Sequence, residues 1–247
     1  MKVIFLGTNG WYATKNGNTT CTLLDSESYY VIFDAGDGIY KLDKYIREEK
    51  PIFIFLSHLH FDHIIGIHIL TKFRFQQKIY IYGAHGTKSY LNEIIKHPFT
   101  VPFQDLPSTV EIHDLNAQTS NLPFSLVYLP LKHSDYCLGY RINLEGKVIT
   151  YATDTGLCEN LYNISDQADL FITECSYKKG QEKWGWPHLK PEEAAVVAQK
   201  SKCDLLVFSH FDPSIFKSRK DREKVEVKTQ KIFQKTRIAE DGLIIEL

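Results

Sequence analysis

Four residues of the types that bind divalent metals lie within six positions, directly after an apolar run of the chain. The run at 51–56 reads PIFIFL, and SHLHFDH follows it at 57–63 with His58, His60, Asp62 and His63. An apolar run without polar alternation is typical of a strand that is buried on both faces. Because loops at strand ends commonly carry functional residues, this arrangement predicts an α/β fold with a metal site directly after the strand.

The rest of the pattern predicts two similar β-rich halves with helices outside them. Strands are expected at 2–7, 19–24, 29–34, 52–57, 78–83, 109–115, 124–131, 137–144, 147–153, 169–175, 204–210 and 242–247. Helices are expected at 37–50, 62–75, 86–96 and 191–201, with a short one before 169. No linker or low-complexity stretch separates the halves. We therefore expect one domain over 1–247, built as a four-layer αββα sandwich of two sheets covered by helices.

The bulk composition narrows the class of protein. The formal net charge is −1, so the total charge does not attract nucleic acid or an anionic membrane. The five cysteines are widely spaced and form no C-x-x-C pair, which favours a reducing compartment over a disulfide framework. The chain shows no signal-peptide pattern and no apolar stretch of the roughly 20 residues that a membrane span needs. We expect a cytoplasmic protein that does not enter a membrane.

Three further ligand candidates stand at the ends of other predicted strands. His133 follows the strand at 124–131, Asp154 follows 147–153, and His210 ends 204–210. Seven nitrogen and oxygen ligands are too many for one tetrahedral zinc ion, but they suit two metal ions that share Asp154. The expected metal is zinc, with manganese or iron as alternatives, because sites of histidine and aspartate accept all three.

In this order and spacing, the residues make the chain resemble the metallo-β-lactamase superfamily. The resemblance covers the whole chain, and SHLHFDH is its most specific motif. It implies the αββα fold. It also implies that His58, His60 and His133 hold one metal and that Asp62, His63 and His210 hold the other, with Asp154 as the bridge.

Within that superfamily the chain is most similar to the ribonuclease Z and phosphodiesterase branch. The stretches FLGTNG and NGNTTCTLL are similar to the N-terminal glycine loop and the second strand of that branch. ITECSY resembles its glutamate motif, which implies a role for Glu174, and PHLKPEEAA resembles its histidine motif, which implies a role for His188.

Two departures separate the chain from a true ribonuclease Z. That enzyme carries a long arm that grips tRNA between its third metal-binding histidine and the bridging aspartate. Here only the 20 residues 134–153 lie between His133 and Asp154, which is enough for two strands and a turn. In that branch a serine and then an arginine–tyrosine pair tend to follow the last histidine directly. Here the stretch reads HFDPSIF, so the residue directly after His210 is a phenylalanine.

The expected activity is that of a phosphodiesterase with two divalent metal ions, acting on a small-molecule or nucleotide diester. The metals lower the pKa of a shared water toward ~7, and Asp62 orients it. His188 gives a proton to the departing alkoxide, and Glu174 holds His188 in the right tautomer. All three roles rest on the resemblance.

Several alternatives stay open at this stage. The same metal pair suits a thioester or lactone hydrolase, and a ribonuclease Z-type tRNA 3′ endonuclease is a further alternative, although nucleic acid is the less favoured partner. An iron-containing oxygen reductase is disfavoured because such relatives usually carry glutamate at the place of His60. A non-catalytic binding module is disfavoured because all seven ligands are present. His188 would have a packing role instead if it rested on Trp184 or Trp186.

Three smaller questions remain at the level of sequence. The segment 217–237 carries nine Lys or Arg against three Asp or Glu, which favours a solvated helix face over a site for a polyanion. His85 follows a predicted strand and is a candidate for the border of the site. A homodimer is compatible with the sequence.

Overall fold

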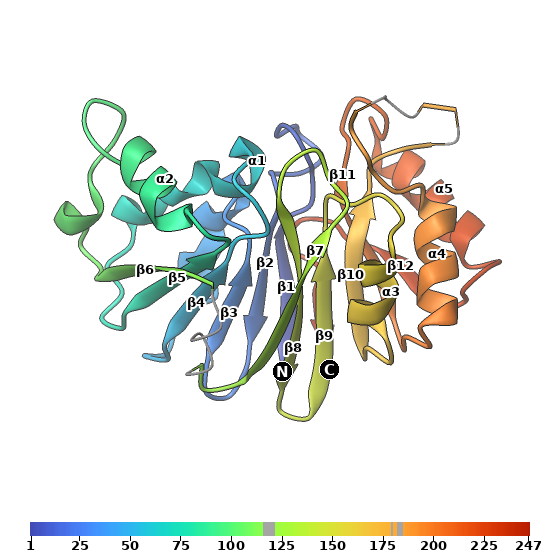
Figure 1. Cartoon of the computed structure of the whole chain (residues 1–247), viewed down its shortest axis with the longest axis horizontal. Helices are drawn as coiled ribbons and strands as arrows, with labels where there is room; N and C mark the ends of the chain where they lie inside the picture. Colours follow the sequence, from blue (N-terminus) through green and yellow to red (C-terminus); the bar gives the residue numbers. More distant parts are fainter. Residues whose placement is uncertain (116–121, 179, 182–184) are drawn as a thin grey trace.

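Two β-sheets stand face to face, and helices lie on both outer sides (Figure 1). The computed structural model describes residues 1–247 apart from 116–121, 179 and 182–184. This arrangement confirms the predicted four-layer αββα sandwich. Among the described residues, no helix has the length and apolar character that crossing a membrane requires. The division into a single domain over 1–247 stays a prediction.

The first sheet has seven strands in the order β13-β1-β2-β3-β4-β5-β6. Pairing is antiparallel from β13 to β3 and parallel from β3 to β6. The last strand of the chain therefore completes the sheet of the first half, beside β1. The strands are β1 (Lys2–Gly7), β2 (Cys21–Asp25), β3 (Tyr30–Phe33), β4 (Ile52–Phe55), β5 (Ile79–Gly83), β6 (Val110–Asp114) and β13 (Ile244–Glu246).

The second sheet has six strands in the order β12-β11-β10-β9-β8-β7. Its pairing follows the same plan, because β7, β8 and β9 are antiparallel and the pairs from β9 to β12 are parallel. This likeness agrees with the two similar halves expected from the sequence. The strands are β7 (Ser125–Leu131), β8 (Cys137–Leu144), β9 (Lys147–Ala152), β10 (Leu170–Cys175), β11 (Leu206–Phe211) and β12 (Thr236–Ile238).

The helices divide between the outer faces of the two sheets. The 3₁₀ helices η1 (Asp37–Lys44) and η2 (Ile65–Lys72) and the α-helices α1 (Phe61–Ile64) and α2 (Thr87–Ile94) pack on the first sheet. The helices α3 (Glu159–Ser165), α4 (Pro191–Lys200) and α5 (Arg219–Thr229) pack on the second. A short 3₁₀ turn, η3 (Phe103–Asp105), precedes β6. Helix α4 begins at Pro191 and has two acids in its first turn, as the sequence predicted.

Aromatic side chains fill the space between the sheets. Phe33 of β3 is fully buried and stacks on Tyr151 of β9, with ring centroids 4.8 Å apart and an interplanar angle of 6°. It also lies 6.0 Å from the ring of Tyr140 on β8. One side chain of the first sheet therefore contacts two strands of the second, which fixes the distance between the sheets at the level of the strand ends.

The helices after β4 and β3 differ from the prediction. The expected helix at 62–75 is a four-residue α-helix that continues as the 3₁₀ helix η2, and the expected helix at 37–50 is the 3₁₀ helix η1. The reason at η2 is close backbone packing: a Cβ on Gly66 would lie 2.2 Å from the carbonyl oxygen of Gly36. The sequence also did not predict the strand β12.

The basic segment 217–237 contains α5, and several of its cations are paired. Arg219 contacts Glu223 and Glu240 at 3.0 Å each, and Lys228 contacts Glu192 of α4. Arg222 is buried and donates to Thr8 and Asn9 in the loop after β1. The preferred interpretation of the segment as a solvated helix face stays a prediction, and Arg222 departs from it because its side chain is buried.

The first prediction concerns the stacked ring between the sheets. Phe33→Ala should lower the free energy of unfolding by about 3–5 kcal/mol, because it removes a fully buried ring and leaves a cavity. Urea denaturation followed by circular dichroism measures the change. Val127→Ala, at a side chain on β7 that is 46% exposed, is the control and should change stability by no more than about 0.5 kcal/mol. A loss below 1 kcal/mol for Phe33→Ala would contradict the described packing.

Candidate metal centre

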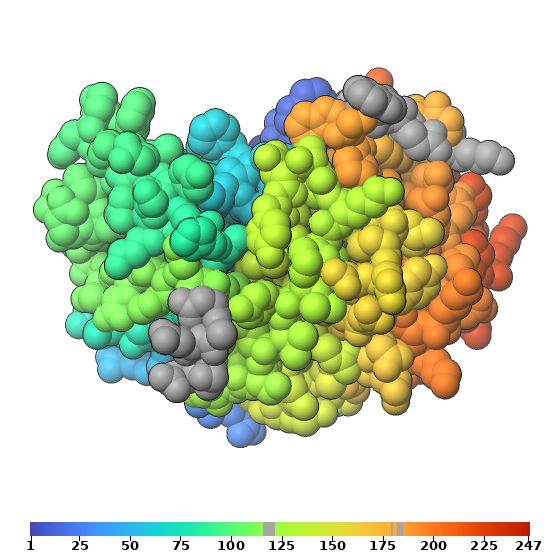
Figure 2. All heavy atoms as spheres, viewed as in Figure 1, coloured from blue at the N-terminus to red at the C-terminus, as the bar shows by residue number. Residues whose placement is uncertain are grey.

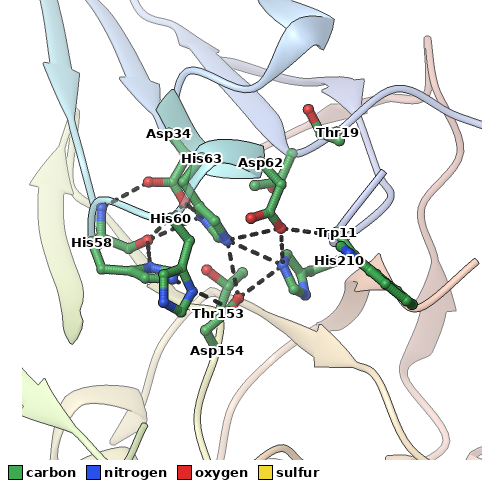
Figure 3. A network of polar contacts seen from close by, with 12 residues as sticks. Trp11, Thr19, Asp34, His58, His60, Asp62, His63, Thr153, Asp154 and His210 are labelled. Carbon is green, nitrogen blue, oxygen red and sulfur yellow. Dashed lines mark hydrogen bonds and ion pairs between the residues drawn. The ribbon is translucent and has the colours of Figure 1, made fainter. Parts of the chain in front are cut away.

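The seven predicted ligands meet at one edge of the two sheets (Figure 3). They come from both halves of the chain: the loop after β4, helix α1, the loops after β7 and β9, and the end of β11. Their ligand atoms form two groups, each with all its atoms within 4.8 Å of one another. The first group is His58, His60, His133 and Asp154, and the second is Asp62, His63 and His210.

Asp154 lies between the two groups and offers one carboxylate oxygen to each. Its Oδ2 is 3.8 Å from Nε2 of His58 and 3.7 Å from Nε2 of His133. Its Oδ1 is 3.3 Å from Nε2 of His63 and 2.9 Å from Nε2 of His210. A carboxylate shared in this way has the position that a bridging ligand requires.

The second group is compact on its own. Nε2 of His63 and Nε2 of His210 are 3.1 Å apart, and Oδ2 of Asp62 lies 3.4 Å from the first and 3.3 Å from the second. All three donor atoms therefore point at one small volume, with Asp154 on its other side (Figure 3).

Asp34 contacts His63 on the side of the ring away from the ligand groups, and no sequence motif pointed to this residue. Its carboxylate is fully buried and lies 2.7 Å from Nδ1 of His63. It also accepts hydrogen bonds from the backbone N–H and the hydroxyl of Ser57, at 2.7 and 2.9 Å, and from the hydroxyl of Tyr151 at 2.7 Å. Because Nδ1 of His63 contacts Asp34, Nε2 is the ring nitrogen that can bind a metal ion.

The loop after β1 holds the other members of the second group. The backbone N–H of Trp11 donates to Oδ2 of Asp62 at 2.7 Å. Gly10 lies flat on the imidazole of His210, since a Cβ there would be 2.4 Å from Cε1 of that ring. A residue with a side chain at position 10 would displace His210, so the glycine loop noted in the sequence has a direct structural purpose.

Three residues of the site have backbone conformations that are unusual for residues other than glycine. Their φ angles are 57° for Asp34, 56° for Asp154 and 47° for His210. Such conformations cost roughly 1–3 kcal/mol each and persist only where the surrounding structure holds them. Their clustering here marks the site as a place where the fold bears strain.

Charge in the site is balanced between carboxylates and imidazoles. Burial alone would lower the pKa of His210, but the charge of Asp154 together with hydrogen bonds to Asp154 and Asp62 outweighs burial and raises that pKa to about 10. Burial opposes the same effect at His63, whose pKa is held well above its usual value by Asp34, Asp62 and Asp154. In the first group, burial holds the pKa of His58 well below its usual value, so this imidazole is neutral, as a metal ligand must be.

A buried nitrogen without a hydrogen-bond partner also indicates that this group of side chains suits a divalent cation. Nε2 of His58 is buried and has no hydrogen-bond partner within the described part of the chain. A buried polar atom without a partner costs free energy, and a bound cation removes that cost. Imidazole nitrogens with carboxylate oxygens are a set that zinc, manganese and iron all accept.

His188 and Glu174 form a pair beside the two groups. Nδ1 of His188 lies 2.8 Å from Oε1 of Glu174, and this fully buried carboxylate also accepts from the backbone N–H of Thr155 at 2.6 Å. The His188 ring lies 5.2 Å from that of His133 and 6.3 Å from that of His210. Burial lowers the pKa of His188, but Glu174 outweighs burial and raises it.

The positions of His188 and His85 answer the other expectations about histidines. The ring of His188 contacts Tyr177, while Trp186 lies near the rings of His60 and His133. Trp184 is outside the described residues. The side chain of His85 is almost fully exposed and lines a cavity next to His58 and His60, so it borders the site without joining either group.

Asp135 is a second residue to which no sequence motif pointed. Its Oδ2 lies 2.8 Å from Nε2 of His60, which leaves Nδ1 of His60 facing the first group, 3.5 Å from Nε2 of His133. Neither Asp34 nor Asp135 belongs to a motif with ligand spacing, so only the folded chain shows their roles.

The chain matches the model of one protein family and is similar to several known proteins. Residues 29–211 match the family model described as "Beta-lactamase superfamily domain". The ribonuclease Z of Streptococcus suis is 27% identical over 315 aligned positions that cover all of both chains. Because this chain has 247 residues, that relative carries insertions without a counterpart here.

Two further similarities concern YhfI of Bacillus subtilis. Its curated sequence, named a probable metallo-hydrolase, is 26% identical over 216 residues and covers 85% of this chain and 86% of its own. The crystal structure of the metallo-beta-lactamase fold protein YhfI matches with a TM-score of 0.81 at 22% identity, covering 99% of each chain. The fold of these proteins implies a pair of divalent metal ions, which agrees with the two groups of ligands.

The second prediction concerns Asp34 and the second group. The protein purified without chelator should contain about two equivalents of divalent metal. Asp34→Asn keeps the shape of the side chain but removes the charge that orients His63, so metal affinity of one site should fall roughly 10–100-fold. Elemental analysis after dialysis against a graded series of chelator concentrations measures both sites.

Asp43→Asn, at an exposed surface carboxylate, is the matched control and should retain the metal content of the parent protein. Equal retention of both metals by Asp34→Asn and Asp43→Asn would show that Asp34 does not support the site.

Proposed function

Because the chain belongs to the beta-lactamase superfamily, we propose that it is a phosphodiesterase with two divalent metal ions that hydrolyses a small-molecule or nucleotide diester. The observation that carries the proposal is the pair of His188 and Glu174 beside the seven ligands. A proton donor at this place serves a poor leaving group such as an alkoxide.

The two groups of side chains are proposed to hold one ion each. His58, His60 and His133 would hold the first, Asp62, His63 and His210 the second, and Asp154 would bridge them. When bound, such a pair supplies Lewis acidity and a hydroxide at neutral pH. Zinc is the first expectation, with manganese or iron as alternatives, because the donor atoms are imidazole nitrogens and carboxylate oxygens.

Asp62 is proposed to orient the attacking water. Its Oδ2 is held by the N–H of Trp11, so the carboxylate has a fixed direction. The contacts with His63 and His210 outweigh burial and hold the pKa of Asp62 below its usual range, and a bound cation would act in the same direction, so the group is an acceptor at neutral pH. A fixed acceptor next to the phosphorus aligns the water with the bond that breaks.

His188 is proposed to give a proton to the leaving oxygen. Glu174 engages Nδ1, so Nε2 is the nitrogen that can carry the proton to the substrate. Glu174 is itself fixed by the N–H of Thr155, which limits rotation of the imidazole. The pair therefore has the arrangement of an acid with a positioning residue behind it.

A thioester or lactone hydrolase is the rival with the same metal pair. A thiolate departs without a proton, so the His188–Glu174 pair favours the phosphodiester over the thioester. A lactone also releases an alkoxide, so this pair does not separate a lactone from a phosphodiester. An activity screen of the metal-loaded protein across phosphodiester, thioester and lactone substrates separates the two classes.

A tRNA 3′ endonuclease is the second candidate, because a ribonuclease Z matches along the whole chain. Against it, residues 134–153 contain only β8, β9 and their short connections, so no arm stands between β7 and Asp154.

The cytoplasm remains the proposed setting, supported by five free cysteines. A homodimer stays a prediction.

The third prediction tests His188 with two leaving groups. General acids contribute about 10²–10⁴-fold, so His188→Ala should lower kcat by that much on a dialkyl phosphodiester. On a 4-nitrophenyl diester the loss should be much smaller, because nitrophenolate departs without a proton. Steady-state kinetics of both substrates and the metal content of both proteins are the measurements.

His113→Ala, at a partly exposed histidine on β6, is the control and should behave as the parent protein on both substrates. Equal losses on the two substrates for His188→Ala would assign His188 to positioning, and loss of metal would make it a ligand.

The fourth prediction concerns tRNA. Without an arm to hold the folded tRNA, the metal-loaded protein should process precursor tRNA far more slowly than it hydrolyses its small diester substrate. Incubation with a labelled precursor at physiological salt, followed by gel electrophoresis, measures the release of the 3′ trailer. Rapid cleavage at a single position would contradict the proposal and favour the endonuclease.

A further inference from the structure

A groove leads away from the metal centre along helix α2. Its volume is about 760 Å³, which lies in the range of sites for small organic ligands. It begins at His58 and His60 and is bordered by Phe61 at the start of α1. In Figure 2 it opens between the green surface that carries α2 and the yellow-green surface of the loop between β7 and β8.

Three aromatic side chains stand exposed on the walls of this groove. Phe61 is 68% exposed, Tyr90 of α2 is 61% exposed and Tyr136 is 64% exposed. They come from three separate segments, and each lines the groove. Exposed aromatic side chains are usually scattered singly over a protein surface. Three large rings around one cavity therefore indicate a binding site for a flat ligand.

The charged side chains of the groove exclude a second phosphate. Among the described residues that line it, there is no Lys or Arg, whereas the carboxylates Glu93 and Asp135 are present. Binding of a polynucleotide depends on cations that neutralise successive phosphates. Asp135 contacts His60, and Glu93 pairs with Lys96 at 3.0 Å, so the described lining offers a chain of phosphates no unpaired cation. We therefore expect the part of a substrate that lies here to carry no negative charge.

The groove and the proposed proton donor serve different parts of a substrate. The residues lining the groove within the described part of the chain do not include His188, which lies by His133 and His210. In an in-line displacement the leaving oxygen departs toward the proton donor. The group that stays on the phosphate is therefore the one that extends into the groove.

We propose that the groove binds an uncharged nucleoside as the retained alcohol of the diester, with its base against Tyr90 and Tyr136. This inference rests on the proposed phosphodiesterase activity and narrows its substrate class. Flat rings match the exposed aromatic side chains, and the hydroxyl and amino groups of a nucleoside can donate to Glu93 and Asp135. The single phosphate of such a diester lies at the metal centre, where its charge is compensated.

A quaternary ammonium group is the main alternative occupant, because aromatic rings with carboxylates also suit a cation. It would fill only a small part of the 760 Å³, whereas a nucleoside uses the length of the groove. The volume therefore favours the nucleoside, and the test includes a cationic substrate.

The experiment uses three 4-nitrophenyl diesters with the same leaving group and different retained groups: thymidine 5′-phosphate, methyl phosphate and phosphorylcholine. The full-length, metal-loaded protein should show a kcat/KM for the thymidine ester about 5- to 150-fold above that for the methyl ester, which is the range of one base–aromatic stack. Tyr90→Ala should remove most of this preference, and Tyr90→Phe should keep it, because the ring alone stacks.

Phe99→Ala, at an exposed aromatic residue that does not line the groove, is the matched control and should keep the full preference. Hydrolysis of all three esters without preference for thymidine would overturn this inference and leave the phosphodiesterase in place. A preference for the phosphorylcholine ester would overturn it in favour of a cation site. Failure to hydrolyse any diester while a thioester or lactone is hydrolysed would overturn the phosphodiesterase and this inference with it.

Discussion

The buried carboxylate of Asp34 is the contact on which the site and the joining of the two sheets both depend. It follows β3 of the first sheet, and it accepts a hydrogen bond from Tyr151 on β9 of the second. The same carboxylate fixes Ser57, at the end of the strand that leads to the ligand motif, and contacts Nδ1 of His63. A buried charge is tolerated only when it is fully paired, so loss of one partner affects all the others.

Because the ligands come from both halves, the metal centre exists only when the sandwich is assembled. Asp154 follows β9 and His210 lies in β11, both of the second half, while Asp62 and His63 lie in α1 after β4. The left-handed backbone at Asp34, Asp154 and His210 is sustained by the packing of both sheets against each other. Divalent cations bound between the halves would stabilise the assembled state and lower the cost of burying Nε2 of His58 without a partner.

The sequence was sufficient to select the seven candidate ligands that the fold brings together, because their signal is local. SHLHFDH follows an apolar strand, and His133, Asp154 and His210 each stand at a strand end, so periodicity and spacing were sufficient to select them. Asp34, Asp135 and Gly10 could not be selected, since their importance lies in contacts with residues distant in the chain. The helix expected at 62–75 is present, but it changes from an α-helix to a 3₁₀ helix at Ile65. There Gly66 packs against the backbone of Gly36, a contact that local periodicity does not show.

Anomalous diffraction from crystals grown with manganese can locate the proposed ions on either side of Asp154. We expect two peaks of anomalous density about 3.5–4 Å apart, one next to His58 and His133 and one next to His63 and His210, with Asp154 between them. A single peak at saturating manganese, or two peaks of which only one contacts Asp154, would contradict it.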